Sequence, residues 1–489
     1  MTLAGVELGA AEVRETHAGV VFLVCDRAYK LKKPVNLGFL DFSTRQRRLD
    51  ACRREVELNR RLAPDVYLGV ADVTDERGEP SDHLVVMRRM PQQRRLLALI
   101  AAGAPLAGHI LTLARLLAVF HAGAQRSDRI TEQGGRDALA ARWEASFEQV
   151  QRVAGDVLPA ATFDEVRRRT RVFLAGRTAL FAARQAAERI VDGHGDLIAE
   201  DVFCLDDGPR VLDCLEFDDR LRWLDGLDDA AFLAMDLEHH GRADLAAAFL
   251  DAYAEFGGDP APASLRHHYV AYRAFVRAKV ACLRHEQGAP EARAEAIAYT
   301  ELARAHLRAG AVRLVLVGGL PGAGKSTLAA RLADQLGAVL LSSDRLRKEL
   351  AGLAPQAPAP AAYGAGIYTP EHSRRCYAEL LRRARELLAR GESVVLDASW
   401  IRAGDRGLAA AVAEETHSEP VALRCTLPAG AAAERIATRG TATPSDADPV
   451  IAAAMAADAD PWPEAVAVPT AGTPDDVATA ALAVVTGAA

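Results

Sequence analysis

Short apolar runs in the first 90 residues predict β-strands, and longer periodic segments after them predict helices. Residues 20–33 (VVFLVCDRAYKLKK) predict two strands joined by a turn at Asp26-Arg27, and residues 82–90 predict another strand. Apolar positions recur at helical spacing in residues 45–63. The same spacing recurs in three longer segments: 108–124, 137–153 and 161–189. The pattern therefore predicts a small strand-containing lobe followed by a larger helical lobe.

The pattern changes twice more along the chain. Residues 190–217 return to strands and loops and carry a dense group of acidic residues, and helices then continue to about residue 309. The next segment, AVRLVLVGG, is continuously apolar, which is typical of a strand buried on both faces of a parallel sheet. We therefore expect a mixed α/β and α+β protein with two domains, whose boundary lies within 300–311. The predicted domains are 1–300, with lobes of about 1–95 and 96–300, and 311–489.

A complete phosphate-binding motif follows the apolar strand of the second domain. The run Gly-Leu-Pro-Gly-Ala-Gly-Lys-Ser at 319–326 matches G-x-x-x-x-G-K-[ST] and opens a predicted helix. Its glycines let backbone N–H groups converge on phosphate oxygens at the helix N-terminus. Lys325 is predicted to reach the β- and γ-phosphates, and Ser326 to bind Mg²⁺. The predicted ATP-binding set is Gly319, Gly322, Ala323, Gly324, Lys325, Ser326 and Thr327.

Three further features of this domain favour phosphoryl transfer to a hydroxyl. Asp344 and Arg347 lie three residues apart at the start of a helix, an arrangement that suits a base for the acceptor and a cation beside it. The alternative is that Ser343 or Asp344 is a simple helix cap. Asp397 ends a second apolar strand, where it suits the Mg²⁺ site. Arg435 and Arg439 lie on a late helix from which they are expected to close over the transferred group.

This domain resembles the small P-loop kinases that include the polynucleotide kinase domain, gluconate kinase and chloramphenicol phosphotransferase. The resemblance covers about 311–489 and is most specific at the phosphate loop and at Ser343-Asp344-x-x-Arg347. The stretch TATPSDADPV (441–450) is similar to the segment after the lid arginine in that group. The resemblance implies that Asp344 is the catalytic base, and it leaves the acceptor open.

A second constellation lies in the first domain, in DGHGDLIAEDVFCLDDGPRVLDCLEFD (192–218). Its acidic residues include Asp196, Asp201 and Asp213, and a pair of Mg²⁺-competent carboxylates with a third near a hydroxyl is what phosphoryl transfer requires. A hairpin with solvated acids is the alternative. Upstream, Lys30 and Lys32 alternate on one strand and so point to one face, and Glu55 on the following helix is able to pair with one of them. A strand lysine paired with a helix glutamate is the device that positions the ATP phosphates in kinase-like folds, and the sequence does not choose between the two lysines for that role.

The segment His194-Gly195-Asp196 resembles the catalytic segment of the aminoglycoside phosphotransferase and choline kinase group. That resemblance implies that Asp196 is the catalytic base and that Asp201 and Asp213 are metal ligands. Asp201 stands where the group has asparagine. The departure adds negative charge at the metal site, which implies either tighter Mg²⁺ binding or a domain that binds nucleotide and turns over poorly.

Nearly the whole chain resembles a bacterial family that joins this kinase-like domain to a P-loop kinase domain. The resemblance is carried by KLKKPVNLGFLDFSTRQRR, LNRRLAPDVYLGV and LDCLEFDDR followed by DGLDDAAFLAMDLE.

Other polar residues are expected to have structural roles. We expect Asp228-Asp229 to hold the loop, and His239-His240 and His267-His268 to lie on helix surfaces.

The composition indicates the chemical class of the acceptor and the cellular compartment of the protein. The 489 residues include 26% charged and 6% aromatic residues, with a net charge of −7, so a small polar hydroxyl acceptor is favoured over nucleic acid. The seven cysteines are scattered and indicate reduced thiols, and the N-terminus has no signal-peptide pattern, so we expect a cytoplasmic protein that does not contact membranes. Two alternatives remain. In one alternative to two kinase sites, the first domain is a nucleotide or metabolite sensor that regulates the second. In the other, the P-loop domain phosphorylates nucleic-acid ends.

Overall fold

The computed structural model describes residues 2–3, 6–7, 12–15, 18–36, 41–354, 357–359, 361–438 and 448–487. The chain forms two compact units, each built from several stretches of sequence. The first comprises Met1–Pro159, Ala183–Ala261 and Tyr269–Ala303, and the second comprises Ala160–Ala182, Pro262–His268 and Arg304–Ala489. In the described part of the chain, no helix combines the length and the apolar character that a membrane crossing requires.

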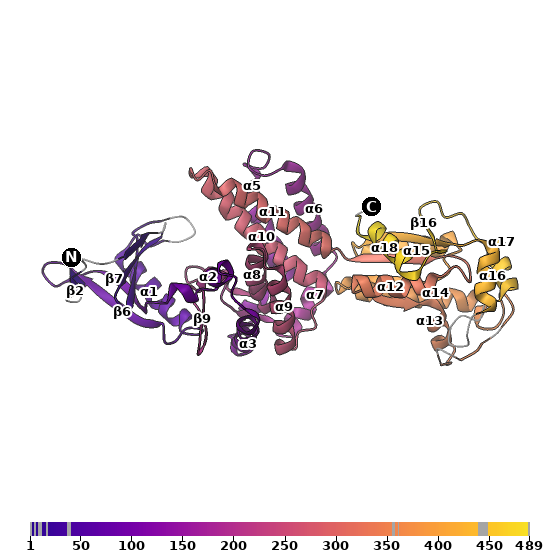
Figure 1. The fold of residues 1–489 in the computed structure, drawn as a ribbon, viewed down its shortest axis with the longest axis horizontal. Coiled ribbons are helices and arrows are strands. Elements are labelled where there is room, and N and C mark those ends of the chain that lie inside the picture. Colours follow the sequence, from indigo (N-terminus) through magenta and orange to yellow (C-terminus); the bar gives the residue numbers. More distant parts are fainter. Residues whose placement is uncertain are drawn as a thin grey trace. The chain divides into compact units, whose positions relative to one another are not determined.

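The first unit begins with an antiparallel sheet of five strands in the order β3-β4-β5-β7-β6. These strands are β3 (Glu12–Glu15), β4 (Gly19–Val24), β5 (Arg27–Lys32), β6 (Tyr67–Thr74) and β7 (Pro80–Arg88), and β1 (Thr2–Leu3) pairs with β2 (Val6–Glu7) apart from them. Helix α1 (Arg45–Asn59) packs on the sheet through Cys52 and Val56 (Figure 1). Thr44 caps its first turn, because its hydroxyl accepts a hydrogen bond from Arg47 N. The predicted strand-containing lobe is confirmed, with the turn of the first hairpin one residue earlier, at Cys25-Asp26.

The rest of the first unit is mainly helical, with two short sheets at its site. Its helices are α2 (Leu96–Ala101), α3 (Ala107–Gly123), α4 (Asp128–Gln133), α5 (Arg136–Gln151), α8 (Gly226–His239), α9 (Ala243–Gly257) and most of α10 (Ala263–Glu286) and α11 (Ala292–Ala309). Strand β8 (Ile190–Asp192) pairs with β11 (Trp223–Asp225), and β9 (Val202–Leu205) pairs with β10 (Gly208–Val211). One-turn 3₁₀ helices lie at Gln92–Arg94, Ala199–Asp201 and Asp219–Leu221.

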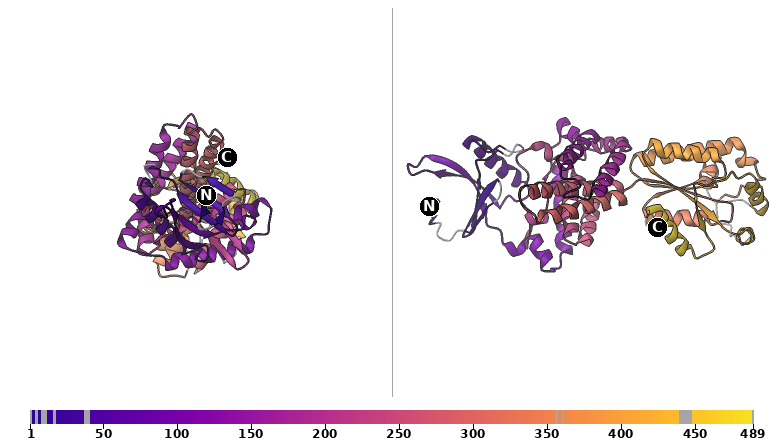
Figure 2. Two further views of the ribbon diagram at one scale, coloured as in Figure 1. Left: turned by 90° about the vertical axis from the view of Figure 1, so that its left-hand side faces the viewer. Right: turned by 90° about the horizontal axis from the view of Figure 1, so that it is seen from above.

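The second unit contains a parallel sheet of five strands in the order β13-β14-β12-β15-β16. The strands are β12 (Arg313–Gly318), β13 (Val339–Ser342), β14 (Val394–Asp397), β15 (Glu419–Thr426) and β16 (Val466–Pro469). Helices cover both faces of the sheet (Figure 2), with α12 (Lys325–Leu336) and α18 (Pro474–Thr486) on one face and α14 (Pro370–Ala389) and α15 (Ala403–Glu415) on the other. The remaining elements are α13 (Ser343–Leu350), a 3₁₀ turn at Gly366–Tyr368, α16 (Ala429–Ala437) and α17 (Pro449–Ala457). The mixed α/β and α+β fold expected from the sequence is thus confirmed.

One predicted helix is wrong as a continuous element. Residues 161–189 form α6 (Ala160–Ala175) and α7 (Thr178–Ala186), which are separated at Gly176. A Cβ at Gly176 would lie 2.2 Å from the carbonyl oxygen of Thr416, so the break lets the backbone approach the end of α15 closely. Arg177 then donates hydrogen bonds to the carbonyl oxygens of Gly176 and Thr416, at 2.8 and 2.7 Å.

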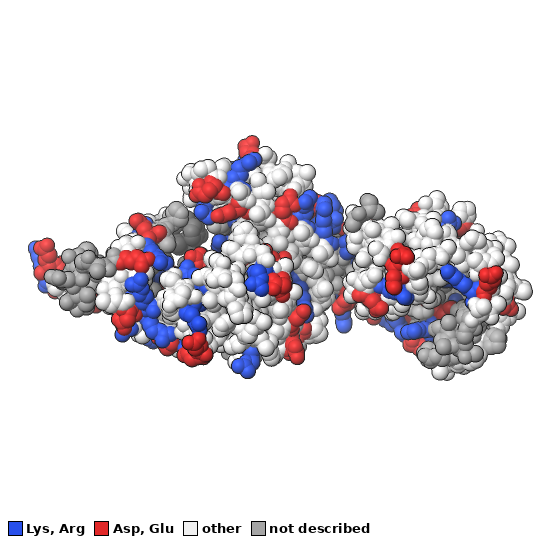
Figure 3. Space-filling view, viewed as in Figure 1, with Lys and Arg blue, Asp and Glu red and all other residues white. Residues whose placement is uncertain are grey.

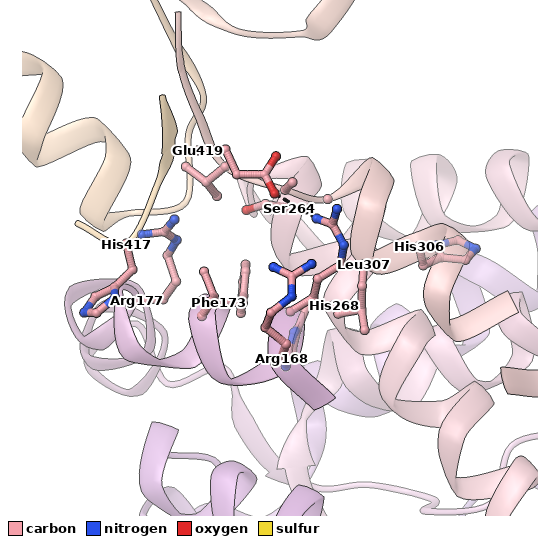
Figure 4. A pocket seen from close by; sticks show the side chains of 14 residues that line it. Arg168, Phe173, Arg177, Ser264, His268, His306, Leu307, His417 and Glu419 are labelled. Carbon is pink, nitrogen blue, oxygen red and sulfur yellow. Dashed lines mark hydrogen bonds and ion pairs between the residues drawn. The ribbon is translucent and has the colours of Figure 1, made fainter. Parts of the chain in front are cut away.

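The stretches 160–182 and 262–268 belong to the second unit and contact the loops that precede its strands β14 and β15. Figure 4 shows Arg177, His417 and Glu419 around a cavity of about 30 Å³. Arg169 donates to Glu419 at 2.8 Å, and the Ser264 hydroxyl donates to the carbonyl oxygen of Gly391 at 2.6 Å. These contacts make residues that precede the phosphate-loop strand by about 45 to 150 positions part of the P-loop unit.

Two side-chain expectations have different outcomes. None of the seven cysteines forms a disulfide, and Cys25 alone among them is exposed, which agrees with reduced thiols. The expectation that His268 lies on a helix surface is wrong, because its side chain is buried and stacks on Phe173 with ring centroids 4.2 Å apart.

Candidate active sites

The phosphate loop of the second unit lies between β12 and α12. Gly324 precedes the helix with φ at +87°, and no side chain caps the first turn, so the N–H groups there face outward to a ligand. A Cβ at Gly322 would lie 2.6 Å from the carbonyl oxygen of Ala432, so only glycine fits this position. The ammonium group of Lys325 donates to the carbonyl oxygen of Leu320 at 3.0 Å, inside the loop. These features fit a bound polyphosphate.

Lys325, Asp344, Arg347 and Asp397 line one cavity of about 780 Å³. Asp344 lies in the first turn of α13 and Arg347 in its last turn. Ser342 rather than Asp344 occupies the cap position, where it makes no capping hydrogen bond. Arg347 is buried and donates to the carbonyl oxygen of Ile367 and to the hydroxyl of Ser373.

Asp397 ends β14 and is buried beside the phosphate loop. Its carboxylate accepts a hydrogen bond from the Ser342 hydroxyl at 3.3 Å, and Ser326 is near enough to act on it. Burial raises its pKa, and the nearby Lys325 ammonium opposes the shift. A serine hydroxyl beside a buried carboxylate at a phosphate loop is a donor set that fits Mg²⁺.

A second cavity of about 300 Å³ lies on the other side of the loop. It is lined by Gly324, Thr327, Arg435, Thr470 and Gly472, among others. Arg435 is held over the loop because it donates to the carbonyl oxygen of Thr470 at 2.8 Å. The sequence pattern pointed to neither Thr470 nor Gly472, because both follow an edge strand of the sheet that carries no motif. Arg439 and most of the segment 441–450 lie outside the described residues.

In the first unit, the two strand lysines and the helix glutamate form one ion network. Glu55 contacts both lysines, with Lys30 Nζ at 2.9 Å and Lys32 Nζ at 2.7 Å. Lys32 also contacts Glu216 at 2.5 Å, and Lys30 contacts Asp213 at 2.6 Å. Burial alone would raise the pKa of Glu55, but the two ammonium groups outweigh it and lower that pKa. Since both lysines pair with Glu55, their burial distinguishes them: the Lys32 side chain is 3% exposed and that of Lys30 is 22% exposed.

The loop after β8 is held by buried groups. Asp229 accepts hydrogen bonds from His194 N at 2.6 Å and Gly195 N at 2.9 Å, and it contacts His121 Nε2 at 3.0 Å. The expectation that Asp228-Asp229 hold the loop is confirmed for Asp229, whereas Asp228 pairs with Arg273. Burial lowers the pKa of His194, whose Nε2 faces the carbonyl oxygen of Leu212 at 3.0 Å. The loop therefore presents Asp196 from a fixed backbone.

The acidic residues Asp196, Asp201 and Asp213 act on one another electrostatically. Burial raises the pKa of Asp196 to about 6, and burial together with Asp213 and Asp196 raises the pKa of Asp201 well above its usual value. Asp213 differs, because Lys30 lowers its pKa. Its backbone has φ at +64°, which is uncommon for a non-glycine residue and typical of functional positions. Mutually repelling carboxylates fit a site that receives a cation.

Within the described residues, no group of three or more His, Cys, Asp or Glu side chains is arranged to hold a metal ion. Mg²⁺ in nucleotide sites commonly takes only one or two protein carboxylates, and phosphate oxygens and water complete its ligands. The pairs Asp201 with Asp213 and Ser326 with Asp397 match that smaller requirement.

Comparisons with known proteins cover both units. Residues 314–461 match the model of a family described as an AAA domain. Protein Rv2004c of Mycobacterium tuberculosis, whose name describes it as uncharacterized, is 45% identical over 461 residues, which cover 94% of this chain and 92% of the relative.

Solved structures overlap with single parts of the chain. The GDP and kanamycin complex of APH(2")-IIia covers 62% of this chain and 95% of its own, with a TM-score of 0.41 and 15% identity. A gluconokinase from Sinorhizobium meliloti covers 37% of this chain and 94% of its own, with a TM-score of 0.27 and 20% identity.

Proposed function

This chain belongs to the bacterial family of Rv2004c, which joins a kinase-like domain to a P-loop domain, and we propose that it is an ATP-dependent phosphotransferase with two kinase-type sites. Each site would transfer the γ-phosphoryl group of ATP to a hydroxyl of a small polar acceptor. The observation that carries the proposal is the cavity of about 780 Å³, because Lys325, Asp344, Arg347 and Asp397 line it together. The lysine that we assign to phosphate binding, the carboxylate that we assign as the base and space for an acceptor thus lie together.

At the P-loop site, the N-terminal turn of α12 and Lys325 would bind the phosphates. Ser326 and Asp397 would hold Mg²⁺, which when bound neutralises phosphate charge. Asp344 would accept the proton of the acceptor hydroxyl, and Arg347 would bind the acceptor or the transferred group. The role of Arg439 in closing over the transferred phosphoryl group stays a prediction.

The smaller cavity beside Gly324 is our candidate for the nucleoside part of ATP. Its position supports this, since a chain of phosphates along the loop would then lead from that cavity into the larger one. A small acceptor fits the charge pattern better than a nucleic acid. Figure 3 shows both signs of charge interspersed on the visible face, and arginines 382, 383 and 385 of α14 each pair with a glutamate.

At the first site we assign phosphate positioning to Lys30 rather than Lys32. Lys30 is the more exposed of the two and faces Asp213, whereas Lys32 is enclosed between Glu55 and Glu216. Asp201 and Asp213 would hold Mg²⁺, and Asp196 would take the proton of the acceptor hydroxyl.

One observation favours a second candidate for this unit. Lys30 and Asp213 pair with each other at 2.6 Å, and Asp201 adds charge where the related group has asparagine. A site that binds nucleotide tightly and turns over slowly would act as a sensor for the P-loop site.

The experiment that separates these candidates measures ADP release from Mg²⁺-ATP across a panel of sugars, aminoglycosides, nucleosides and oligonucleotides. The unaltered chain is compared with Asp196→Asn and Lys325→Ala, and the surface variants Asp207→Asn and Lys33→Ala serve as matched controls. If each site variant loses a different acceptor-dependent activity, the chain has two working kinase sites. If only Lys325→Ala loses activity, the first unit is a sensor, and if neither does, the proposal fails.

A further inference from the structure

Helix α10 carries two arginines, one turn apart, beside the candidate base of the first unit. Arg273 donates to both carboxylate oxygens of Asp228, at 2.7 and 2.9 Å, and to the carbonyl oxygen of Gly195 at 3.4 Å. Its charge is therefore balanced, and its contacts fix the helix against the loop that carries Asp196. Arg277 follows four residues later, so it lies on the same face of α10.

Arg277 has a different environment from Arg273. It is half-buried, and its guanidinium carbon lies 5.9 Å from the centre of the Tyr299 ring. In the part of the chain that the structure describes, no carboxylate forms an ion pair with Arg277, although its charge acts on Asp196 and Asp236. The guanidinium thus keeps donors for a ligand near the base.

The other polar groups here are engaged with one another. Asp236 accepts a hydrogen bond from Ala199 N at 2.8 Å, and its second oxygen lies 3.7 Å from His240 Nε2. His239 stacks on Tyr299, with ring centroids 3.9 Å apart and an angle of 16° between the rings. Arg277 is the group of this set that offers a full positive charge to an incoming acceptor.

We propose that the acceptor of the first site carries an oxyanion, either a carboxylate or a phosphate, and that Arg277 binds this group while the acceptor hydroxyl faces Asp196. Tyr299 and His239 form the wall beside it. An acceptor that carries ammonium groups would be repelled by Arg277. The inference rests on the proposed function of this site and names the class of its acceptor.

The transfer itself is balanced within the site. The acceptor oxygen forms a bond to the γ-phosphorus, and the bond from that phosphorus to the bridging oxygen of ATP breaks. The bridging oxygen keeps the electron pair and leaves as part of ADP, and the hydroxyl proton passes to Asp196. Arg277 takes no proton in this step and acts through binding.

The test uses the full chain with Lys325→Ala, so that turnover comes from the first site. Four acceptors share one hexose ring and differ in charge: glucuronate, glucose 6-phosphate, glucose and glucosamine. We expect kcat/KM to be highest for one or both anionic acceptors, and their comparison distinguishes carboxylate from phosphate. Arg277→Gln should raise the KM of that acceptor by about tenfold or more, with a smaller change in kcat. Arg284→Gln, on the same helix but paired with Glu295, is the control and should change neither value.

A binding measurement on a variant that lacks the candidate base tests the inference independently of catalysis. Asp196→Asn with bound ATP is titrated with the same four compounds, with and without Arg277→Gln. Preferred binding of glucose or glucosamine, no binding of either anion, or equal losses for all four compounds on Arg277→Gln would overturn the inference. If Asp196→Asn leaves acceptor-dependent turnover unchanged, the proposed function of the first site fails, and the titration still shows whether Arg277 binds oxyanions.

Discussion

Replacing Lys32 or Lys30 by methionine separates structural stabilisation from nucleotide binding in the ion network of the first unit. Methionine keeps most of the side-chain length and removes the charge. The Lys32 side chain is 3% exposed, and its two partners, Glu55 and Glu216, are 0% and 12% exposed. Removal of one partner from a buried ion pair costs about 3–5 kcal/mol, since a buried charge is left uncompensated. We take about 3 kcal/mol for Lys32→Met, because Lys30 still contacts Glu55.

Lys30→Met should cost much less stability. Its second partner, Asp213, is 51% exposed and can be hydrated, and Glu55 keeps Lys32. We expect a loss of about 1 kcal/mol or less, as for solvent-exposed pairs. Nucleotide binding should show the opposite order, because Lys30 is the lysine that we assign to the phosphates.

Hydrogen exchange of peptides from β5 and α1 measures the local stability without assuming two-state unfolding of a two-unit chain. Lys32→Met should exchange about a hundredfold faster there, and Lys30→Met less than about tenfold faster. A fluorescent ATP analogue, titrated in the Lys325→Ala background, should bind Lys30→Met at least about tenfold more weakly and Lys32→Met with little change. Equal exchange rates for the two variants, or loss of binding in Lys32→Met alone, would refute this assignment of roles.

Three further predictions concern the second unit. Asp344→Asn should lower kcat at the P-loop site by about a hundredfold or more while ATP affinity is retained, which single-turnover and binding measurements distinguish. Gly176→Ala should destabilise the unit by about 1–3 kcal/mol, because its Cβ would lie 2.2 Å from the carbonyl oxygen of Thr416, whereas Gly407→Ala, in open space on α15 of the same unit, should not. Burial lowers the pKa of His268 to about 3, from about 6.5 in an unfolded chain, so the unfolded state binds more protons in that window and stability falls as pH falls through it. The loss is about 2 kcal/mol at pH 5, and thermal unfolding at pH 7.5 and 5.0 should show a smaller decrease for His268→Asn.

Elements with a strong local pattern could be predicted from the sequence, and contacts between distant segments could not. The phosphate loop, its strand and its helix are specified by neighbouring residues, so their positions agree with the pattern. The helix break at Gly176 has no such signal, because the residue that requires it, Thr416, lies 240 positions away. The burial of His268 is a second feature that depends on a contact between distant segments. Its helical spacing left its face undetermined, and Phe173 on another helix decides its burial.

The candidate sites show a similar division. Alternation along a strand correctly placed Lys30 and Lys32 on one face, but only the structure shows that both contact Glu55. Chain position gave no indication of Arg277, because a lone arginine on an amphipathic helix is typical of a solvated face. Its contact with Tyr299 and its electrostatic effect on Asp196 distinguish it.

The second unit is not encoded by one continuous stretch of sequence. It includes 160–182 and 262–268 as well as residues from 304 onward, and Arg177 and Ser264 contact the ends of α15 and α14. A gene fragment that begins at the phosphate-loop strand would encode the sheet without these helical stretches. Recombination or engineering that transfers the P-loop unit to another protein must therefore supply substitutes for both stretches. Otherwise it must place polar residues on the surface that these stretches cover here.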